Sequence, residues 1–270
     1  MEMNVIYASD NKFADILRVS LLSLLKNTEK NDTVHIWIID NNISQSKKEE
    51  FGELLTGFVN AKLTFLQVNR AAFNKAINLD RGSISAYDRL MVGSILPHEV
   101  DRVIYLDSDV IIQKSLKDLY SIELGDKVLA AVSDVFNSTY KKNLNIPVEY
   151  SMFNNGVMLI DLVKWRDLNL EEQLLKQLDM FEGNPLQGDL GLLNSILYNS
   201  YYELDPRYNM MTAFYDFTYE ELLRFKRPTT YYSKADLENA KKEVVIRHFT
   251  TSIPSIRPWY IDSDVDGIEL

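Results

Sequence analysis

The sequence predicts a single α/β domain, in which a mostly parallel sheet is flanked by helices on both faces and followed by a small C-terminal extension. Over the first two-thirds of the chain, short apolar runs alternate with amphipathic stretches, the rhythm of β-α-β units. The chain has 270 residues, of which 46% are hydrophobic, enough for the core of one large domain. It contains no internal repeat, low-complexity tract or linker that would divide it.

Seven short apolar runs predict β-strands, and each is followed by polar or turn-forming residues. They are residues 5–8, 34–39, 63–66, 103–106, 128–132, 157–160 and 244–246. Between and after them, five segments have helical character: residues 13–25, 44–55, 85–96, 171–181 and 189–198.

The helices are predicted from apolar spacing and from residues that begin or end helices. In the first of them, Ile16, Leu17, Leu21, Leu24 and Leu25 recur every three or four residues and form one apolar face. Ser44 is a favoured N-cap for the second helix, and Pro97 ends the third.

Composition excludes several classes of protein. The chain has no cysteine, which removes disulfide scaffolds, thiolate zinc sites and cysteine nucleophiles. Its net charge of −10 disfavours binding to nucleic acid, and the acidic segment 259–270 disfavours tight anchoring on an anionic membrane. No segment has the roughly 20 consecutive apolar residues of a membrane span, and the first residues lack a secretory signal. We therefore expect a cytoplasmic protein.

Acidic residues follow several of the predicted strands. Asp10, Asp40, Asp107, Asp109 and Asp134 each come directly after an apolar run. In open α/β sheets, ligands bind at the carboxyl ends of the strands, so these positions are where a site is expected.

The strongest local pattern is the pair Asp107 and Asp109 inside the apolar run 103–112. A charge in an apolar run is costly unless something compensates it. On an extended backbone, residues two apart point to the same side, and paired carboxylate oxygens suit Mg²⁺ or Mn²⁺. The alternative is an ordinary Asp-Ser-Asp turn, because both residue types favour turns.

Six short motifs, in order, resemble glycosyltransferase family 8, which includes bacterial lipopolysaccharide α-galactosyltransferases and glycogenin. They are residues 8–10, 86–90, 105–109, 153–156, 188–194 and 248–249, and the resemblance spans residues 4 to 259. It implies a GT-A fold, which is a single Rossmann-like domain, together with a UDP-sugar donor, Mn²⁺ dependence and retention of anomeric configuration.

The resemblance also implies site residues on the nucleotide side. Asp107, Asp109 and His248 match the family's metal ligands, although a lone histidine at a strand end is more often structural. The other positions match segments that contact the nucleotide: Ala8, Asp10, Ser108 and Arg257. Arg257 arrives about three residues later than the family pattern, and Thr251 replaces its glycine.

On the sugar side, the resemblance implies contacts from Arg89, Asn154, Asn155, Gly156 and Asp189. Each has a simpler interpretation. Arg89 fits a helix surface, residues 154–156 fit a turn leading into a strand, and Asp189 fits a helix N-cap.

Two further positions concern the reaction itself. Asp134 resembles an acidic residue near the acceptor, with a plain loop aspartate as the alternative. Leu190 stands where the family usually has a glutamine, and a leucine side chain has no lone pair to serve as a nucleophile. A mechanism therefore requires Asp189 or a direct attack on the front face.

The predicted function is a hexosyltransferase that uses a UDP-sugar and a saccharide, glycolipid or protein-linked acceptor. Residues 1–125 would bind the nucleotide, and residues 126–260 the donor sugar and the acceptor. One alternative is a sugar nucleotidyltransferase, disfavoured because residues 8–11 contain no glycine for a phosphate loop. The other is a UDP-sugar-binding protein with weak catalysis.

Overall fold

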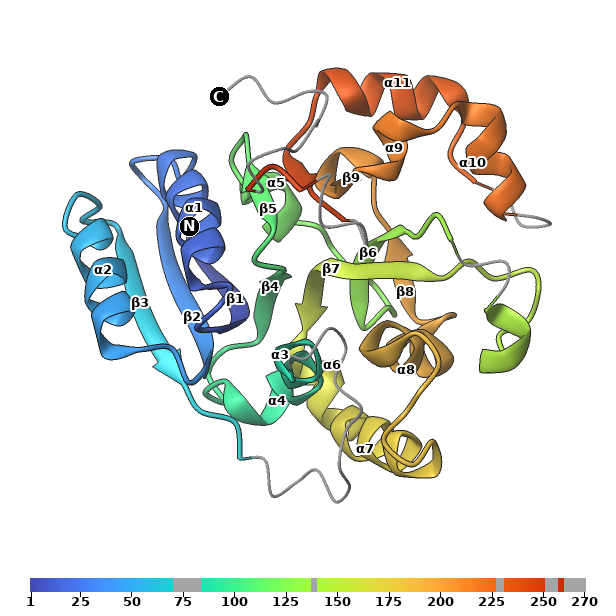
Figure 1. Ribbon diagram of the computed structural model, residues 1–270, viewed down its shortest axis with the longest axis horizontal. Coiled ribbons are helices and arrows are strands. Elements are labelled where there is room, and N and C mark those ends of the chain that lie inside the picture. The colour runs from blue at the N-terminus through green and yellow to red at the C-terminus, as the bar shows by residue number, and fades with distance from the viewer. Residues whose placement is uncertain (70–83, 137–139, 227–230, 251–256, 260–270) are drawn as a thin grey trace.

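The computed structural model describes residues 1–69, 84–136, 140–226, 231–250 and 257–259. Among these residues, seven strands form a central sheet in the order β3-β2-β1-β4-β7-β6-β8 (Figure 1). The strands are β1 (Glu2–Asp10), β2 (Thr33–Asn41), β3 (Ala61–Leu66), β4 (Arg102–Leu106), β6 (Leu129–Ser133), β7 (Phe153–Asp161) and β8 (Tyr201–Glu203).

The sheet is mostly parallel, as predicted, with one strand reversed. β1 lies between β2 and β4 and is parallel to both, with Tyr7 opposite Ile38 and Leu106. β7 runs antiparallel to β4 on one side and to β6 on the other, with Met158 opposite Tyr105 and Ala131. This reversal brings the start of β7 beside the carboxyl end of β4, where the acidic pair follows.

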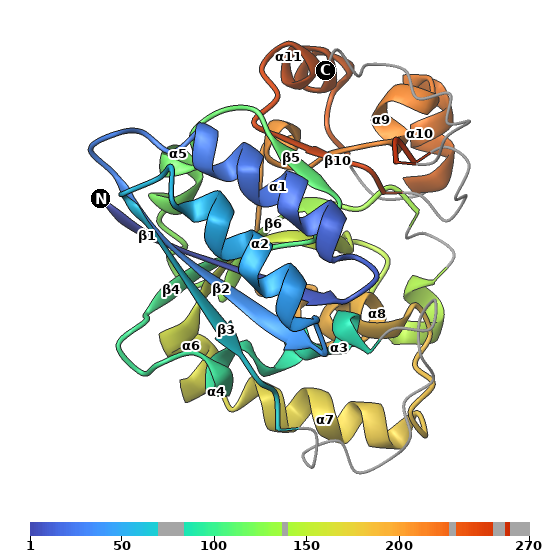
Figure 2. The same ribbon diagram turned by 60° about the vertical axis from the view of Figure 1, so that its left-hand side comes forward.

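Helices cover both faces of the sheet. The helices are α1 (Ala14–Lys26), α2 (Gln45–Leu55), α3 (Ser85–Asp88), α4 (Val92–Ile95), α5 (Lys117–Tyr120), α6 (Leu162–Asp167), α7 (Leu170–Met180), α8 (Gly188–Leu197), α9 (Ala213–Asp216), α10 (Tyr219–Lys226) and α11 (Lys234–Lys242), with short 3₁₀ turns η2 (Arg89–Met91), η3 (Lys141–Leu144) and η4 (Pro206–Tyr208). In Figure 2, α1 and α2 lie on one face, and α4, α6 and α7 on the other.

Strand alternation divides the core into two clusters, one on each face. In β1, Val5 and Tyr7 belong to the cluster beneath α1, whereas Ile6 belongs to the opposite cluster with Trp165 of α6. Successive strand residues point to opposite faces, so an unbroken apolar run is what a sheet covered on both sides requires.

A second, three-stranded sheet was not predicted. It consists of β5 (Val110–Ile112), β10 (Ile246–His248) and β9 (Met210–Met211), in that order. β10 is antiparallel to β5 and parallel to β9. The strand predicted at 244–246 is therefore displaced by two residues, and His248 lies within it rather than after it.

The helix predicted over residues 85–96 is broken into α3, the 3₁₀ turn η2 and α4. The residues from Tyr87 to Val92 are all buried, so this segment has no solvent-facing side and does not follow the amphipathic period. The break within this segment lies at Met91, whose φ of −101° and ψ of 16° depart from helical values.

Two further local predictions differ from the structure. Residues 154–156 lie inside β7 and are not a loop before it. Ser44 occupies the N-cap position of α2 but makes no side-chain capping hydrogen bond.

Within the described part of the chain, no helix is long and apolar enough to cross a membrane. Thr251 and the acidic segment after residue 259 lie outside the described residues.

Candidate active site

Asp107 and Asp109 flank a tight turn that carries the chain from β4 in the large sheet to β5 in the small one. The turn is held from both sides, because the Asp107 N–H donates to the Gly156 carbonyl at 2.8 Å and the Phe249 N–H donates to the Asp109 carbonyl at 3.0 Å. The expectation of an extended backbone was wrong here. The segment is a turn, and its two carboxylates nevertheless converge.

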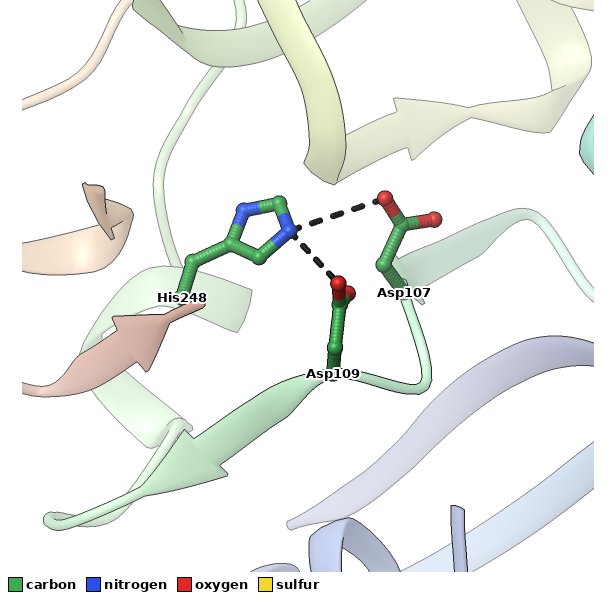
Figure 3. A group of neighbouring side chains, drawn as sticks. All are labelled: Asp107, Asp109 and His248. Carbon is green, nitrogen blue, oxygen red and sulfur yellow. Dashed lines mark ion pairs between the residues drawn. The ribbon is translucent and has the colours of Figure 1, made fainter. Parts of the chain in front are cut away.

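His248 completes a three-residue cluster with these carboxylates (Figure 3). Its Nε2 lies 3.2 Å from Asp109 Oδ1 and 3.7 Å from Asp107 Oδ2. The cause is strand pairing, since β10 places His248 opposite Val110, the residue next to Asp109. One ligand atom from each residue lies within 4.8 Å of the others. Two carboxylates and an imidazole are a donor set that suits a divalent cation such as Mn²⁺.

Gly156 gives this cluster its space. A Cβ at residue 156 would lie 2.7 Å from Asp107 Oδ2 and closer still to Cε1 of His248. No real side chain fits there, so the glycine permits the close approach of two elements.

Arg89 lies beneath the cluster and connects it to Asp189. Its Nη2 donates to Asp107 Oδ1 at 2.8 Å, and its Nε lies 3.0 Å from Asp189 Oδ2. Its Nη1 donates to the carbonyl of Asn155 at 2.7 Å, and the guanidinium lies over the ring of Tyr105. With 6% exposure, Arg89 is a buried site residue and not a helix-surface side chain.

Charges in this buried setting influence one another. Burial acts against ionisation of Arg89, but neighbouring negative groups, Asp107 foremost, raise its pKa above the ordinary value. Burial raises the pKa of Asp189, and Arg89 opposes that effect. Burial also acts to raise the pKa of Asp109, but His248 and Arg257 outweigh it and hold that pKa below its usual range.

Asp189 lies in the first turn of α8 and is not the N-cap residue, a position held by Gln187. Its Oδ2 accepts a 2.5 Å hydrogen bond from the amide of Asn155 in addition to the Arg89 contact. The strand β7 and the helix α8 therefore meet at this carboxylate.

The residues matched to nucleotide contacts gather around one cavity of about 170 Å³. Its lining residues come from four segments of the chain, one of which contains Asp107 and Asp109: Ala8, Ser9, Asp10, Phe13, Ser85, Ala86, Arg89, Tyr105, Asp107, Ser108, Asp109 and Arg257. Ser108 Oγ donates to the Ala8 carbonyl at 3.3 Å, which joins the turn to the end of β1. Arg257 Nη1 lies 3.6 Å from Asp109 Oδ2.

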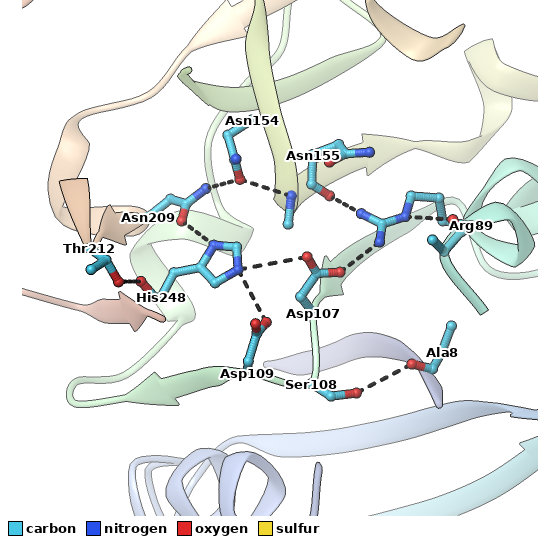
Figure 4. Close-up of polar contacts among 12 residues, drawn as sticks. Ala8, Arg89, Asp107, Ser108, Asp109, Asn154, Asn155, Asn209, Thr212 and His248 are labelled. Atoms are coloured by element: carbon cyan, nitrogen blue, oxygen red, sulfur yellow. Dashed lines mark hydrogen bonds and ion pairs between the residues drawn. The ribbon is translucent and has the colours of Figure 1, made fainter. Parts of the chain in front are cut away.

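Figure 4 shows a line of side-chain amides that runs from His248 through Asn209 to Asn154, and Asn154 in turn contacts Asp134. His248 Nδ1 is 2.8 Å from Asn209 Oδ1, and Asn209 Nδ2 donates to Asn154 Oδ1 at 2.9 Å. Asn154 Nδ2 in turn donates to Asp134 Oδ2 at 2.9 Å. Asp134 is therefore joined to the cluster through Asn154 and Asn209 and is not part of it.

Asn209 was not predicted from the sequence. It is fully buried between η4 and the two-residue strand β9, and no sequence pattern marks so short a strand. Leu190 behaves as an apolar residue, since it packs against Leu144, Ile146 and Met152 beside η3.

The chain is similar to several known proteins. The family model described as Glycosyl transferase family 8 matches residues 4–262. General stress protein A of Bacillus subtilis strain 168 is 26% identical over 250 residues, covering 92% of this chain and 85% of that protein. Glycosyltransferase GlyB of Streptococcus pneumoniae serotype 4 is 24% identical over 265 residues, covering 97% of this chain and 58% of that protein. The crystal structure of the galactosyltransferase LgtC in complex with donor and acceptor sugar analogs superposes with a TM-score of 0.77 at 26% identity, covering 96% of this chain and 90% of that one.

Proposed function

The chain belongs to glycosyltransferase family 8, and from that premise we propose that it is a metal-dependent retaining hexosyltransferase with a UDP-sugar donor. The chain is a glycosyltransferase with a GT-A fold. The donor hexose is proposed to be glucose or galactose, and the acceptor a saccharide, glycolipid or protein-linked sugar.

The observation that carries the proposal is the convergence of Asp107, Asp109 and His248 beside the cavity described above. The same cavity is lined by the residues matched to nucleotide contacts, which are Ala8, Asp10, Ser108 and Arg257. These three residues would hold Mn²⁺ or Mg²⁺, which acts as a Lewis acid and template that stabilises the charge on a departing diphosphate. The donor set fits such an ion, and the cavity beside it fits the phosphate end of a nucleotide.

Nucleotide recognition is assigned to the cavity walls. Asp10 is held rigidly, because its Oδ1 accepts the N–H groups of Lys12 and Phe13 at 2.9 and 3.0 Å. A carboxylate fixed in this way is suited to accept a hydrogen bond from a uracil ring. Arg257, buried beside Asp109, is suited to meet a diphosphate.

Transfer requires that the bond between the sugar C1 and the UDP oxygen breaks while the acceptor hydroxyl forms a new bond to C1. The acceptor proton passes to the leaving diphosphate, which balances the charge. Arg89 stays cationic and orients Asp107 and Asp189. Asp189, ionised, stabilises positive charge at C1 or bonds to it transiently. Leu190 supplies neither function, so the reaction depends on Asp189 or on front-face attack.

The test is release of UDP from UDP-glucose, UDP-galactose and their N-acetyl forms, with Mn²⁺ and with a chelator. We expect Mn²⁺-dependent release from one hexose donor, lost on Asp107→Ala or Asp109→Ala and retained in Asp126→Ala, an exposed carboxylate paired with Lys127. Unchanged activity in either cluster variant contradicts the metal site. Donor binding without release identifies a binding protein, and release of pyrophosphate from UTP and a sugar phosphate identifies a nucleotidyltransferase.

Two wider assignments also belong to the proposal. Residues 1–125 bind the nucleotide and residues 126–260 the donor sugar and acceptor, a division supported by the cavity, whose described lining residues come mostly from the first part. The protein is proposed to act in the cytoplasm.

A further inference from the structure

Among the hydrogen bonds that connect His248 to Asp134 through Asn209 and Asn154, one contact identifies its donor without ambiguity. The backbone N–H of Gly156 can only donate, and it donates to Asn154 Oδ1 at 3.1 Å. This fixes the orientation of the Asn154 amide, because a flipped amide would set its NH₂ group against that N–H.

The other end of the same amide agrees. Asn154 Nδ2 donates to Asp134 Oδ2 at 2.9 Å, and a flipped amide would set its oxygen against that carboxylate. Both neighbours of Asn154 therefore require the same orientation.

The orientation of Asn154 then determines that of Asn209. Asn154 Oδ1 is an acceptor, so the atom of Asn209 that lies 2.9 Å from it must be the NH₂ group. The remaining atom of the Asn209 amide is the oxygen, and it lies 2.8 Å from His248 Nδ1. An oxygen without a hydrogen requires a donor, so the proton of the imidazole lies on Nδ1.

We infer that Asn209, oriented by Asn154, is a positioning residue that holds His248 as the Nδ1–H tautomer and so leaves the Nε2 lone pair for a cation shared with Asp107 and Asp109. The geometry agrees, because Nε2 is the atom that faces both carboxylates. Partners behind a metal-binding histidine typically fix its tautomer and change metal affinity by about 10- to 100-fold. Where it concerns metal, the inference rests on the proposed function.

The inference also changes the role of Asn154. Its Oδ1 accepts two hydrogen bonds and its Nδ2 donates one to Asp134. These contacts give Asn154 a positioning role behind His248.

The first test reads the tautomer directly. Long-range ¹H–¹⁵N spectra of His248 are recorded for the metal-free protein, at a pH high enough to leave the ring neutral. We expect a protonated Nδ1 and a bare Nε2. A proton on Nε2 overturns the inference. This measurement does not depend on metal binding. If the proposed metal site is wrong, the wild type will not bind Mn²⁺. If the inference about Asn209 is wrong, the proton will be on Nε2, so the two failures are distinguishable.

The second test measures Mn²⁺ affinity by electron paramagnetic resonance in folded variants. Asn209→Leu keeps the volume but removes both hydrogen bonds, and we expect affinity to fall by about 10- to 100-fold. Asn209→Asp keeps an oxygen facing Nδ1 but sets its second oxygen against Asn154 Oδ1, so it should recover only part of the affinity lost in Asn209→Leu. The matched control is Asn4→Leu, which removes a partly buried amide bonded to Trp37 and Tyr120 and should leave affinity within twofold. An Asn209→Leu affinity within twofold of the wild type overturns the inference.

Discussion

At residue 156 the side chain is a single hydrogen atom because His248 and Asp107 occupy the space where a methyl group would stand. Alone, Asn-Asn-Gly reads as a turn signal, and the resemblance to family 8 gave it a donor-sugar role. The contacts give the glycine a steric role: it lets β7 pass directly behind two of the three converging side chains.

We predict that Gly156→Ala weakens Mn²⁺ binding and activity together. Overpacking typically costs about 1–3 kcal/mol, and if it is relieved by moving the two ligands, the Kd for Mn²⁺ rises roughly 10- to 100-fold. Titration with Mn²⁺ measures this. The control is Gly52→Ala in α2, where a Cβ would meet nothing within 4 Å, and the substitution should stabilise the helix by roughly 0.5–1 kcal/mol. Wild-type affinity in Gly156→Ala would show that the space is not needed.

Asp189 gives a prediction on the pH dependence of stability. Burial raises its pKa in the folded protein, so folding favours the protonated form. Between the ordinary aspartate pKa of about 3.9 and the higher folded value, the folded state binds more protons than the unfolded state. The free energy of unfolding must then fall as pH rises through that window, by at most about 1.4 kcal/mol per pH unit.

Urea unfolding at a series of pH values measures this contribution as the difference between the wild type and Asp189→Asn, which cannot titrate at that position. Equal pH profiles for the two proteins contradict the prediction. Arg89→Met should widen the window, because Arg89 opposes the rise in pKa.

Residue by residue, the sequence singled out the three residues that converge and the arginine between the two carboxylates, because these residues belong to ordered motifs of a known family. It did not identify Asn209, because an asparagine before two methionines has no local pattern. The N-cap reading, which the sequence left open as the simpler alternative for Asp189, is wrong, because Gln187 holds that position and the partner of the Asp189 carboxylate is the distant Arg89.

At the scale of elements, the strands that are buried on both faces were predicted well and the short or crowded elements were not. Long apolar runs such as residues 34–39 can only be strands or buried helices, and their length decides between these. β5, β8, β9 and β10 have only two or three residues each, and their pairing depends on distant segments. The segment 85–96 does not keep one helical period, because its central residues 87–92 are all buried.

The N-terminal cap of one helix gives a prediction at the scale of elements. α11 begins with a capping box, in which Ser233 Oγ accepts the Asp236 N–H and the Asp236 carboxylate accepts the Ser233 N–H. We predict that Ser233→Ala costs about 1 kcal/mol in unfolding free energy. Ser44→Ala serves as the matched control and should cost much less, because Ser44 makes no such bond. Denaturant unfolding measures both, and equal losses would mean that the capping box is not what stabilises α11.

For the whole molecule, the important feature is that the converging ligands belong to two separate sheets. Asp107 follows a strand of the seven-stranded sheet, whereas Asp109 and His248 adjoin or belong to the three-stranded one. The two sheets are joined directly by the turn at Ser108. A cation bound here would therefore fasten the small sheet to the large one.

We predict that Mn²⁺ raises the thermal unfolding temperature. A ligand that binds only the folded state stabilises it by about 2.7 kcal/mol at a free concentration 100 times its Kd, which corresponds to roughly 5 °C or more for a chain of this size. Differential scanning fluorimetry with Mn²⁺ and with chelator measures the shift. It should disappear in Asp109→Ala and persist in Asp126→Ala. A shift that survives in Asp109→Ala would place the ion elsewhere.

The parallel pairing of β9 with β10 also sets an order of events during synthesis on the ribosome. A nascent chain that has emerged only as far as β8 already carries both aspartates and most of the large sheet, yet the imidazole and the amide behind it have not been made. Such an intermediate has an acidic turn without its third ligand. The three-residue cluster is therefore complete only after β10 has docked between β5 and β9.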